Sequence, residues 1–174
     1  MVLVGVQDPG NVGTILRAAE AFGATGAATC SADGLGTADP FSPKALRASA
    51  GSALRLPVVH GLPAGDLVSA LRAHRNKRVT IYAAVAAAKE VAGQKPHAAS
   101  PILFPWEADW KSPVAVLIGN EGAGLPADIE NAADARVSIP QSAATTPIGS
   151  ESLNAAMAAT VLLYEAMRQR NLLR

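Results

Sequence analysis

The sequence contains little charge and few aromatic residues. Asp, Glu, Lys and Arg make up 17% of its 174 residues, and Phe, Trp and Tyr only 4%. A globular domain usually has about 25% charged residues. The core must therefore be built from Ala, Val, Leu and Ile. The formal net charge of +1 excludes a strong whole-molecule field for nucleic acid, although a local basic patch remains open.

Cysteine is almost missing, since Cys30 is the only one. A single cysteine excludes an internal disulfide and is typical of a reducing, cytoplasmic setting. Cys30 lies in the apolar stretch "GAATCS", so we expect a buried, inert thiol rather than a reactive one. The three histidines, His60, His74 and His97, show no metal-ligand spacing. We therefore expect no bound metal.

Long hydrophobic runs are missing too. No stretch approaches the roughly 18 apolar residues of a membrane span. No basic region precedes the apolar start "MVLVGV", as it would in a signal peptide. We therefore expect no membrane segment and no secretory leader. The length of 174 residues predicts one domain, residues 1–174, with a substantial core.

Short apolar runs alternate with helical patterns along the chain. The expected strands are 2–6, 25–30, 56–60, 79–85, 114–119 and 136–140. The expected helices are 11–23, 42–51, 65–75, 126–133 and 151–171, with N-caps at Asn11, Ser42, Asp66 and Ser150. Residues 86–113 are the least regular part. This alternation predicts an α/β fold with a parallel sheet, whose ligands bind beyond the carboxyl ends of the strands.

The first chemical motif is "QDPGNVGTILR", after the first expected strand. Gly13 and Arg17 are four residues apart and so share one helix face. Gly13 has no Cβ, so a ligand could approach that face closely. Arg17 offers a planar cation suited to phosphate or to a developing oxyanion. The alternative is a capped amphipathic helix with a solvated arginine.

The second motif, "AVLIGNEGAGLP", places three glycines around Glu121 after the fifth expected strand. Their order, G-x-x-G-x-G, differs from the dinucleotide fingerprint G-x-G-x-x-G, and the Lys-Ser/Thr of a phosphate-binding P-loop is missing. A glycine-rich turn without a ligand is the alternative. Glu121 weakens that alternative, since the sequence shows no structural reason for an acid there.

The third motif, "SIPQSAATTPIGSESLN", joins a strand end to the last expected helix. Ser152 and Asn154 are expected in the first turn of that helix, where free N–H groups favour developing negative charge. A helix with an ordinary cap is the alternative. Farther along, an apolar series recurs at helical spacing: Leu153, Met157, Val161, Tyr164 and Met167.

Together these motifs resemble the three signature motifs of the SpoU (TrmH-like) RNA 2'-O-ribose methyltransferases, of the SPOUT superfamily. "SPKALRASAGSALRLPV", residues 42–58, also resembles that family. The resemblance spans almost the whole chain, in the right order. It implies a SPOUT α/β fold with a C-terminal trefoil knot, a bound S-adenosylmethionine and a homodimer. The cofactor contacts that it implies are Ala84, Gly119, Asn120, Gly122, Ile139, Pro140 and Leu153.

The resemblance also implies the residues of the reaction, in which a methyl group passes to a ribose 2'-hydroxyl. The family assigns the arginine of its first motif, here Arg17, to activating that hydroxyl. Because a guanidinium is a poor base, we prefer phosphate binding and alkoxide stabilisation for Arg17. Arg17 could act near the partner subunit's cofactor. The remaining catalytic candidates, which would orient the nucleophile or hold the arginine, are Asn11, Glu121, Ser152 and Asn154.

The chain departs from the family pattern in two places. Many members carry an N-terminal RNA-binding domain, and this chain starts almost on its first strand, so we expect that domain to be absent or trimmed. The loop between Pro140 and Ser152 also looks longer than is common. RNA contact is then expected from local cations. The run "RAHRNKR" (72–78) is open between phosphate binding and a solvated helix end. Lys44, Arg47 and Arg55 form a second set; Lys44 and Arg47 follow the first motif more closely, and they are equally open between RNA contact and a solvated surface. Trp106 and Trp110 could stack on bases or anchor residues 86–113.

The leading hypothesis is a cytoplasmic methyltransferase that acts on ribosomal RNA, with transfer RNA as the second choice. A catalytically silent RNA-binding or assembly module of the same fold is the main alternative. A nucleotide-binding oxidoreductase is a third hypothesis, weakened by the order of the glycines.

Overall fold

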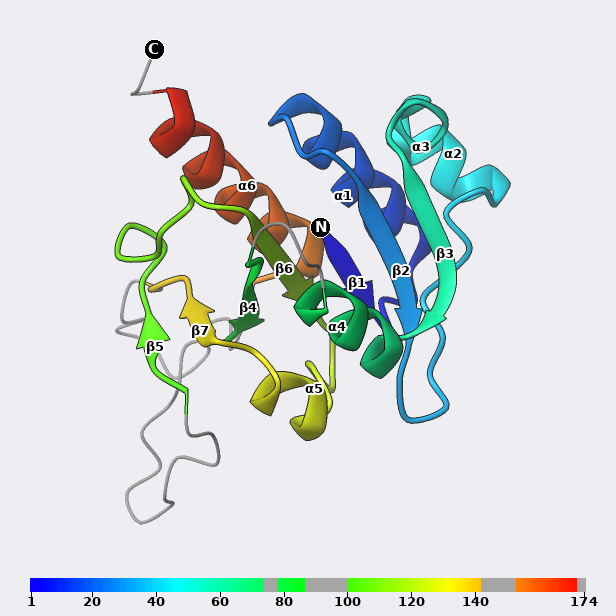
Figure 1. The fold of residues 1–174 in the computed structure, drawn as a ribbon. Helices are drawn as coiled ribbons and strands as arrows, with labels where there is room; N and C mark the ends of the chain where they lie inside the picture. The colour runs from blue at the N-terminus through cyan, green and yellow to red at the C-terminus, as the bar shows by residue number, and fades with distance from the viewer. Residues whose placement is uncertain (74–77, 87–99, 142–152, 172–174) are drawn as a thin grey trace, which may run out of the picture.

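The chain folds around one seven-stranded sheet with the order β3-β2-β1-β6-β4-β7-β5. The computed structural model describes residues 1–73, 78–86, 100–141 and 153–171. All neighbouring strands in it run parallel, which confirms the predicted α/β class (Figure 1). The strands are β1 Val2–Val4, β2 Ala27–Ser31, β3 Val58–Pro63, β4 Thr80–Val85, β5 Ile102–Leu103, β6 Val114–Ile118 and β7 Ala135–Ser138.

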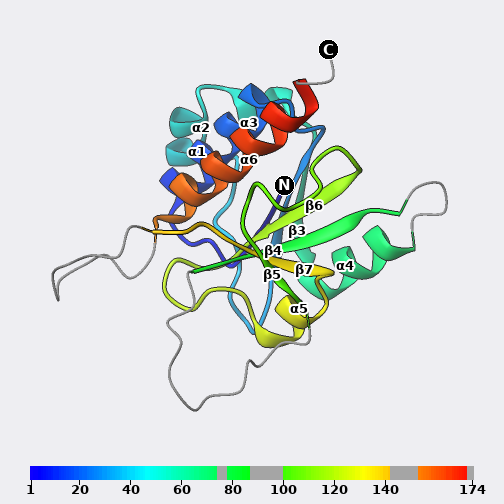
Figure 2. The ribbon, with the colours of Figure 1, turned by 90° about the vertical axis from the view of Figure 1, so that its left-hand side faces the viewer.

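Helices cover both faces of the sheet. They are α1 Pro9–Ala21, α2 Pro43–Ser49, α3 Ser52–Arg55, α4 Ala64–Arg72, α5 Ala127–Asn131 and α6 Ala155–Asn171. Figures 1 and 2 show α1, α2, α3 and α6 together on one face, and α4 and α5 on the other.

The sheet separates two apolar cores because successive strand residues point to opposite faces. In β1, Leu3 joins the core that includes Ile15 of α1 and Leu162 of α6. Val2 and Val4 join the other core, with α4 and α5. Cys30 lies in that second core, 1% exposed, and burial raises the pKa of its thiol to about 11. The predicted burial of Cys30 is confirmed.

The strand order reverses between β1 and β6. The chain runs outward from β1 through β2 to β3, and all later strands lie on the other side of β1. The loops that follow β1 and β6 diverge at such a reversal, which opens a crevice at the carboxyl ends of the strands. The topology therefore places the first and second sequence motifs side by side.

Helix starts differ from the predictions in three places. Asp8, not Asn11, caps α1: its side chain accepts a hydrogen bond from Gly10 N (3.2 Å), and Pro9 begins the helix. Asn11 lies within the first turn. α4 begins at Ala64, so Asp66 lies in its first turn and is not its cap.

The last helix begins later than predicted. α6 starts at Ala155, and the side-chain oxygen of Asn154 accepts hydrogen bonds from the N–H groups of Ala156 (2.9 Å) and Met157 (3.3 Å). Asn154 is therefore the cap, and the predicted start at 151 with Ser150 as its cap is wrong. Ser150 and Ser152 themselves lie outside the described residues. The helix α3 and the two-residue strand β5 were not predicted.

Gly13 serves helix packing and not ligand approach. A Cβ on Gly13 would lie 2.3 Å from the carbonyl oxygen of Ala45 and 2.7 Å from the Cβ of Ala48, both on α2. The glycine therefore lets α1 and α2 come close together, and the expectation that a ligand uses this space is wrong.

The trefoil knot stays a prediction. The chain between β4 and β5 includes residues 87–99, and the chain between β7 and α6 includes residues 142–152, all outside the described residues. How these two connections pass each other is therefore not part of the described structure.

Candidate active site

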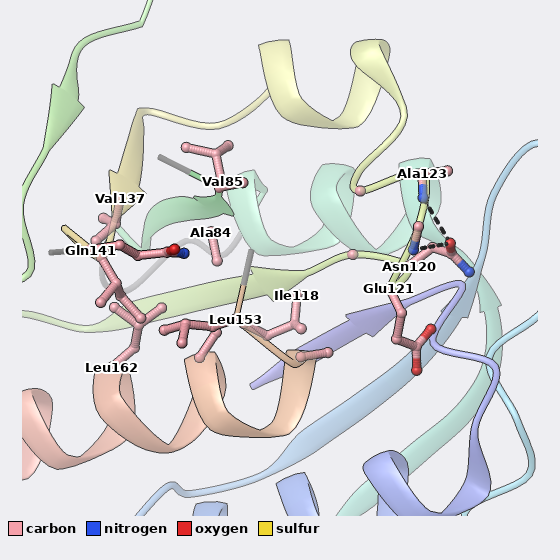
Figure 3. A pocket seen from close by; sticks show the side chains of 17 residues that line it. Ala84, Val85, Ile118, Asn120, Glu121, Ala123, Val137, Gln141, Leu153 and Leu162 are labelled. Atoms are coloured by element: carbon pink, nitrogen blue, oxygen red, sulfur yellow. Dashed lines mark hydrogen bonds between the residues drawn. The ribbon is translucent and has the colours of Figure 1, made fainter. Parts of the chain in front are cut away.

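A cavity of about 270 Å³ lies at the carboxyl edge of the sheet, between the ends of β4, β6 and β7 and the start of α6. We call it the carboxyl-edge cavity (Figure 3). Six of the seven predicted cofactor residues line it: Ala84, Gly119, Asn120, Gly122, Ile139 and Leu153. Pro140 does not belong to the lining. The three distant sequence segments therefore converge on one hollow.

Several other residues that line this cavity, most of them apolar, were not predicted from the sequence. The missed residues are Val85, Ala86, Ile118, Ala123, Gly124, Val137, Gln141, Ala155, Ala158 and Leu162. One signal was available on α6. Ala155, Ala158 and Leu162 are three and four residues apart, so they share one face of the helix. The cavity is thus mostly apolar with a few polar groups, as small-molecule sites usually are.

The loop after β6 is closed by its own backbone. Asn120 and Gly124 exchange two backbone hydrogen bonds of 2.9 and 3.0 Å, and Gly124 has a φ of +74°. A Cβ on Gly119 would lie 2.4 Å from the carbonyl carbon of Gly124. Gly119 is therefore required by the loop itself, whereas a Cβ on Gly122 would meet only the Asn120 side-chain oxygen, at 3.6 Å.

The Asn120 side chain holds this loop in place. Its oxygen accepts hydrogen bonds from the N–H groups of Gly122 and Ala123, both at 2.9 Å, and its nitrogen donates to the Gly5 carbonyl, also at 2.9 Å. Figure 3 shows Asn120 turned back towards Ala123. The amide therefore ties the loop to the end of β1.

Glu121 has a structural role that the sequence did not reveal. Its carboxylate accepts hydrogen bonds from the backbone N–H groups of Gln7 (3.3 Å) and Asp8 (3.5 Å) and from the Asn11 side chain (2.9 Å). In Figure 3 it points away from Ile118 and Leu162. Burial alone would raise the pKa of Glu121, but the hydrogen bonds from Asn11 and from the backbone outweigh it and lower the pKa. Glu121 is therefore ionised near neutral pH.

Asn11 connects Glu121 to the last helix. While its nitrogen donates to Glu121, its oxygen accepts a hydrogen bond of 3.1 Å from the Asn154 side chain. We call Glu121, Asn11 and Asn154 the Asn11 network. The network joins the loop after β6, α1 and the start of α6. Three of the five predicted catalytic residues thus lie in hydrogen-bond contact.

Arg17 lies apart from this network. It is exposed on α1 and is absent from the lining of the carboxyl-edge cavity. Within the described residues it makes no hydrogen bond or ion pair. Among the described residues, neither Glu121 nor Asn154 makes a hydrogen bond or an ion pair with the Arg17 guanidinium, so these residues do not hold the arginine within one chain.

The expected RNA-binding cations differ in whether a carboxylate already pairs with them. Lys44 is paired with Asp8, at 2.5 Å between Nζ and Oδ1, and this hydrogen bond lowers the pKa of Asp8. Arg47 is exposed on α2 and, among the described residues, has no partner. Arg55 is engaged with Glu20, whose pKa falls to about 2 because of hydrogen bonds from Arg55 and then Ser52. Arg47 is therefore the most available cation of this group.

The basic run 72–78 is partly engaged as well. Arg72 and Arg78 both approach Asp134, each at 3.5 Å, and Arg72 also donates to the Ala132 carbonyl. Residues 74–77 lie outside the described residues. Arg72 and Arg78 therefore link α4 and the start of β4 to the end of α5.

The described part of the chain has neither a metal-ligand cluster nor a membrane-spanning helix. No three His, Cys, Asp or Glu side chains gather there in a way that could hold a metal ion. Among those same residues, no helix has the length and apolar character needed to cross a membrane.

Similar proteins are found among rRNA methyltransferases. The model of the SpoU rRNA Methylase family matches residues 1–164. An uncharacterized tRNA/rRNA methyltransferase of Synechocystis sp. is 38% identical over 175 residues, which cover 98% of this chain and 53% of that protein. The 23S rRNA (uridine(2479)-2'-O)-methyltransferase of Streptomyces viridochromogenes is 36% identical over 162 residues, covering 93% of this chain and 50% of that protein. The chain thus spans about half the length of these relatives.

Two solved structures are similar over nearly all of the chain. The SpoU methyltransferase AviRb from Streptomyces viridochromogenes, in complex with AdoMet, gives a TM-score of 0.79 at 32% identity and covers 98% of this chain and 59% of that one. The AdoMet-bound rRNA methyltransferase from Sinorhizobium meliloti gives a TM-score of 0.74 at 34% identity, covering 97% and 55%.

Proposed function

Because the chain belongs to the SpoU rRNA Methylase family, we propose that it transfers a methyl group from S-adenosylmethionine to a ribose 2'-hydroxyl of ribosomal RNA. The observation that carries the proposal is the meeting of the carboxyl-edge cavity and the Asn11 network at the loop after β6. A place for a cofactor and a set of polar groups that could face a substrate thus share one loop. The setting proposed for this reaction is the cytoplasm.

The residues of the cavity fit S-adenosylmethionine. Apolar side chains, among them Ile118, Ile139 and Leu153, suit a flat adenine. Backbone groups of the loop 119–124 that its own hydrogen bonds leave unused, such as the Gly122 and Ala123 carbonyls, could pair with the polar edges of the adenine. When bound, the cofactor supplies an activated methyl group.

Glu121 then acts as a positioning residue and not as a general base. A base must bind a proton near neutral pH, and the hydrogen bonds that lower the pKa of Glu121 oppose this. Its oxygens already accept from Asn11 and from the backbone before α1. Glu121 would therefore hold the start of α1 against the loop after β6.

Arg17 is the proposed contact to the reacting RNA. A guanidinium stays protonated and so cannot take the hydroxyl proton, but it can bind the adjacent phosphate and stabilise a developing alkoxide. Its exposure and lack of a partner among the described residues leave it available for this. Arg47 and, after release from Asp8, Lys44 would contact phosphates farther along the RNA.

A homodimer is the proposed form of the enzyme. α6 presents an apolar stripe to solvent: Met157 is 61% exposed, Val161 40% and Tyr164 50%. A stripe of this kind on a 17-residue helix is typical of an interface. Since Arg17 does not line the cavity of its own chain, pairing would let it act beside the partner subunit's cofactor.

Calorimetry and methyl transfer test this function together. Arg17→Ala is expected to leave S-adenosylmethionine affinity within about twofold and to lower methyl transfer to ribosomal RNA by about 100-fold or more, the scale of losing a transition-state donor. Arg17→Lys, which keeps the charge but loses the planar fork, should recover part of the activity. Cofactor binding without any transfer by the unmodified chain would instead support a silent RNA-binding module.

A further inference from the structure

Two exposed aromatic rings form a stack beside the edge strand β5. The rings of Phe104 and Trp106 have centroids 5.1 Å apart and an angle of 24° between their planes. Phe104 is 41% exposed and Trp106 57% exposed. The proposed reaction so far gives these rings no role, although they belong to the few aromatic residues of the chain.

The turn that carries the pair is held by several hydrogen bonds. Phe104 N donates to the Glu107 carboxylate (2.8 Å), and Glu107 N donates to the Phe104 carbonyl (3.0 Å). The Trp110 indole donates to the Pro105 carbonyl at 2.6 Å. Trp110 is fully buried and packs edge-on against Tyr82, at 5.2 Å between centroids. The two exposed rings therefore stand on an anchored turn.

The position of the turn relates it to the candidate active site. β5 pairs in parallel with β7, with Leu103 opposite Val137, and Val137 lines the carboxyl-edge cavity. Phe104 follows directly after β5, so the pair begins at the same edge of the sheet as the cavity. A polynucleotide strand that enters the cavity with one ribose could continue across this edge.

We propose that the Phe104–Trp106 pair is a stacking platform for an unpaired base of the RNA substrate. Nearly parallel rings with exposed surface can add a nucleobase as a further layer. Stacking requires only a flat base, so the platform would bind next to the target nucleotide without reading its identity. This inference rests on the proposed function, because that function supplies the RNA.

The test uses the whole 174-residue chain and two synthetic RNA hairpins. One hairpin has an unpaired loop, and the other carries abasic nucleotides in the same loop, so that both present the same phosphates. The unmodified chain is expected to bind the first about tenfold more tightly, the scale of one stacked base. Trp106→Ala should bind both hairpins equally, whereas Trp106→Phe should keep most of the preference. Val59→Ala, at the opposite edge strand β3 and 51% exposed, should keep all of it.

Tryptophan fluorescence of the unmodified chain gives a second measurement that needs no variant. Trp106 is exposed and Trp110 is buried, so the loop hairpin should quench the emission while the abasic hairpin leaves it unchanged. A preference that survives in Trp106→Ala, or equal quenching by both hairpins, would overturn the platform. A changed sedimentation mass of Trp106→Ala with the preference intact would overturn it too, in favour of a second copy on this surface.

Failure of the platform can be told from failure of the proposed function. S-adenosylmethionine binding and the kcat of methyl transfer should be the same in Trp106→Ala and in the unmodified chain, while KM for RNA rises about tenfold. If the unmodified chain binds the cofactor and transfers methyl groups without a base preference, the platform falls and the proposed function stands.

Discussion

Single side chains carry most of the candidate site, and Asn11 shows what the sequence could and could not predict about them. The family motifs grouped Asn11, Glu121 and Asn154, and the structure joins them by hydrogen bonds. Helix capping was assigned to the wrong residue, although Asp8 followed by Pro9 is a strong start signal. Glu121 lies 110 positions after Asn11 and still binds it. The order of the strands brings the two residues together, and no local sequence pattern contains that order.

At the residue scale, Gly119 and Gly122 of the loop after β6 should respond differently to substitution by alanine. Gly119→Ala puts a Cβ 2.4 Å from the Gly124 backbone, so the loop must open. We expect a loss of about 1–3 kcal/mol in unfolding free energy and at least tenfold weaker S-adenosylmethionine binding. Gly122→Ala meets only an ordinary contact and should keep the stability. Urea unfolding and calorimetry measure both effects, and equal stability of the two variants would contradict this account of the loop.

At the scale of elements, short apolar runs predicted six of the seven strands, most of which are buried parallel strands with continuous apolar segments. β5 was missed since two residues, Ile102 and Leu103, are too few to show a pattern. The sequence could not show that the apolar stripe of Met157, Val161 and Tyr164 on α6 is exposed and not buried in the core. An exposed stripe and a core stripe both have helical spacing, and alanines that look neutral, such as Ala159, fill the buried face instead.

The contact between α1 and α2 should depend on Gly13. Alanine at this position would place its Cβ 2.3 Å from a backbone oxygen of α2, which forces the helices apart at a cost of about 1–3 kcal/mol. The thermal midpoint should then fall by about 5 °C for a chain of this size. Gly65→Ala in α4, where a Cβ has no neighbour within 4 Å, should leave the midpoint unchanged or slightly higher. Circular dichroism melting curves give both values.

The exposed stripe of α6 should control the oligomeric state. Val161→Asp introduces a charge that pairing would bury twice in a symmetric dimer, so we expect a monomer in sedimentation equilibrium. Val59→Asp, an equally simple change on the exposed edge strand β3, should leave the mass unchanged. If Val161→Asp kept the same mass as the unmodified chain, the dimer surface would lie elsewhere.

At the scale of the whole molecule, the parallel sheet and its carboxyl-edge site followed from the alternation of strands and helices. The order of the strands did not, because long-range pairing is not encoded in local periodicity. The sequence also could not show which surface cations pair with carboxylates. Lys44 pairs with Asp8, 36 positions away, and Arg55 pairs with Glu20, 35 positions away.

Acid should destabilise the folded molecule as a whole. Among the residues that the structure describes, five carboxyl groups have pKa values lowered by folding: Asp8, Glu20, Asp109, Glu121 and Glu165. The unfolded chain therefore binds more protons in acid, so stability is full above about pH 5 and falls as the pH drops towards the folded values, about 2 for Glu20. Melting curves between pH 7 and pH 3 measure the fall. Glu20→Gln should melt earlier at pH 7 and lose less on acidification, and equal slopes would contradict the assigned role of the Arg55 pair.

The Asn11 network also bears on the biosynthesis of the protein. Its members lie 110 and 143 positions apart in the chain, so a polypeptide still emerging from the ribosome carries Asn11 long before Asn154 exists. Contacts between such remote segments form late. A nascent chain that has not yet reached Asn154 therefore cannot close the Asn11 network, and α1 and the start of α6 stay unlinked until that residue has been added.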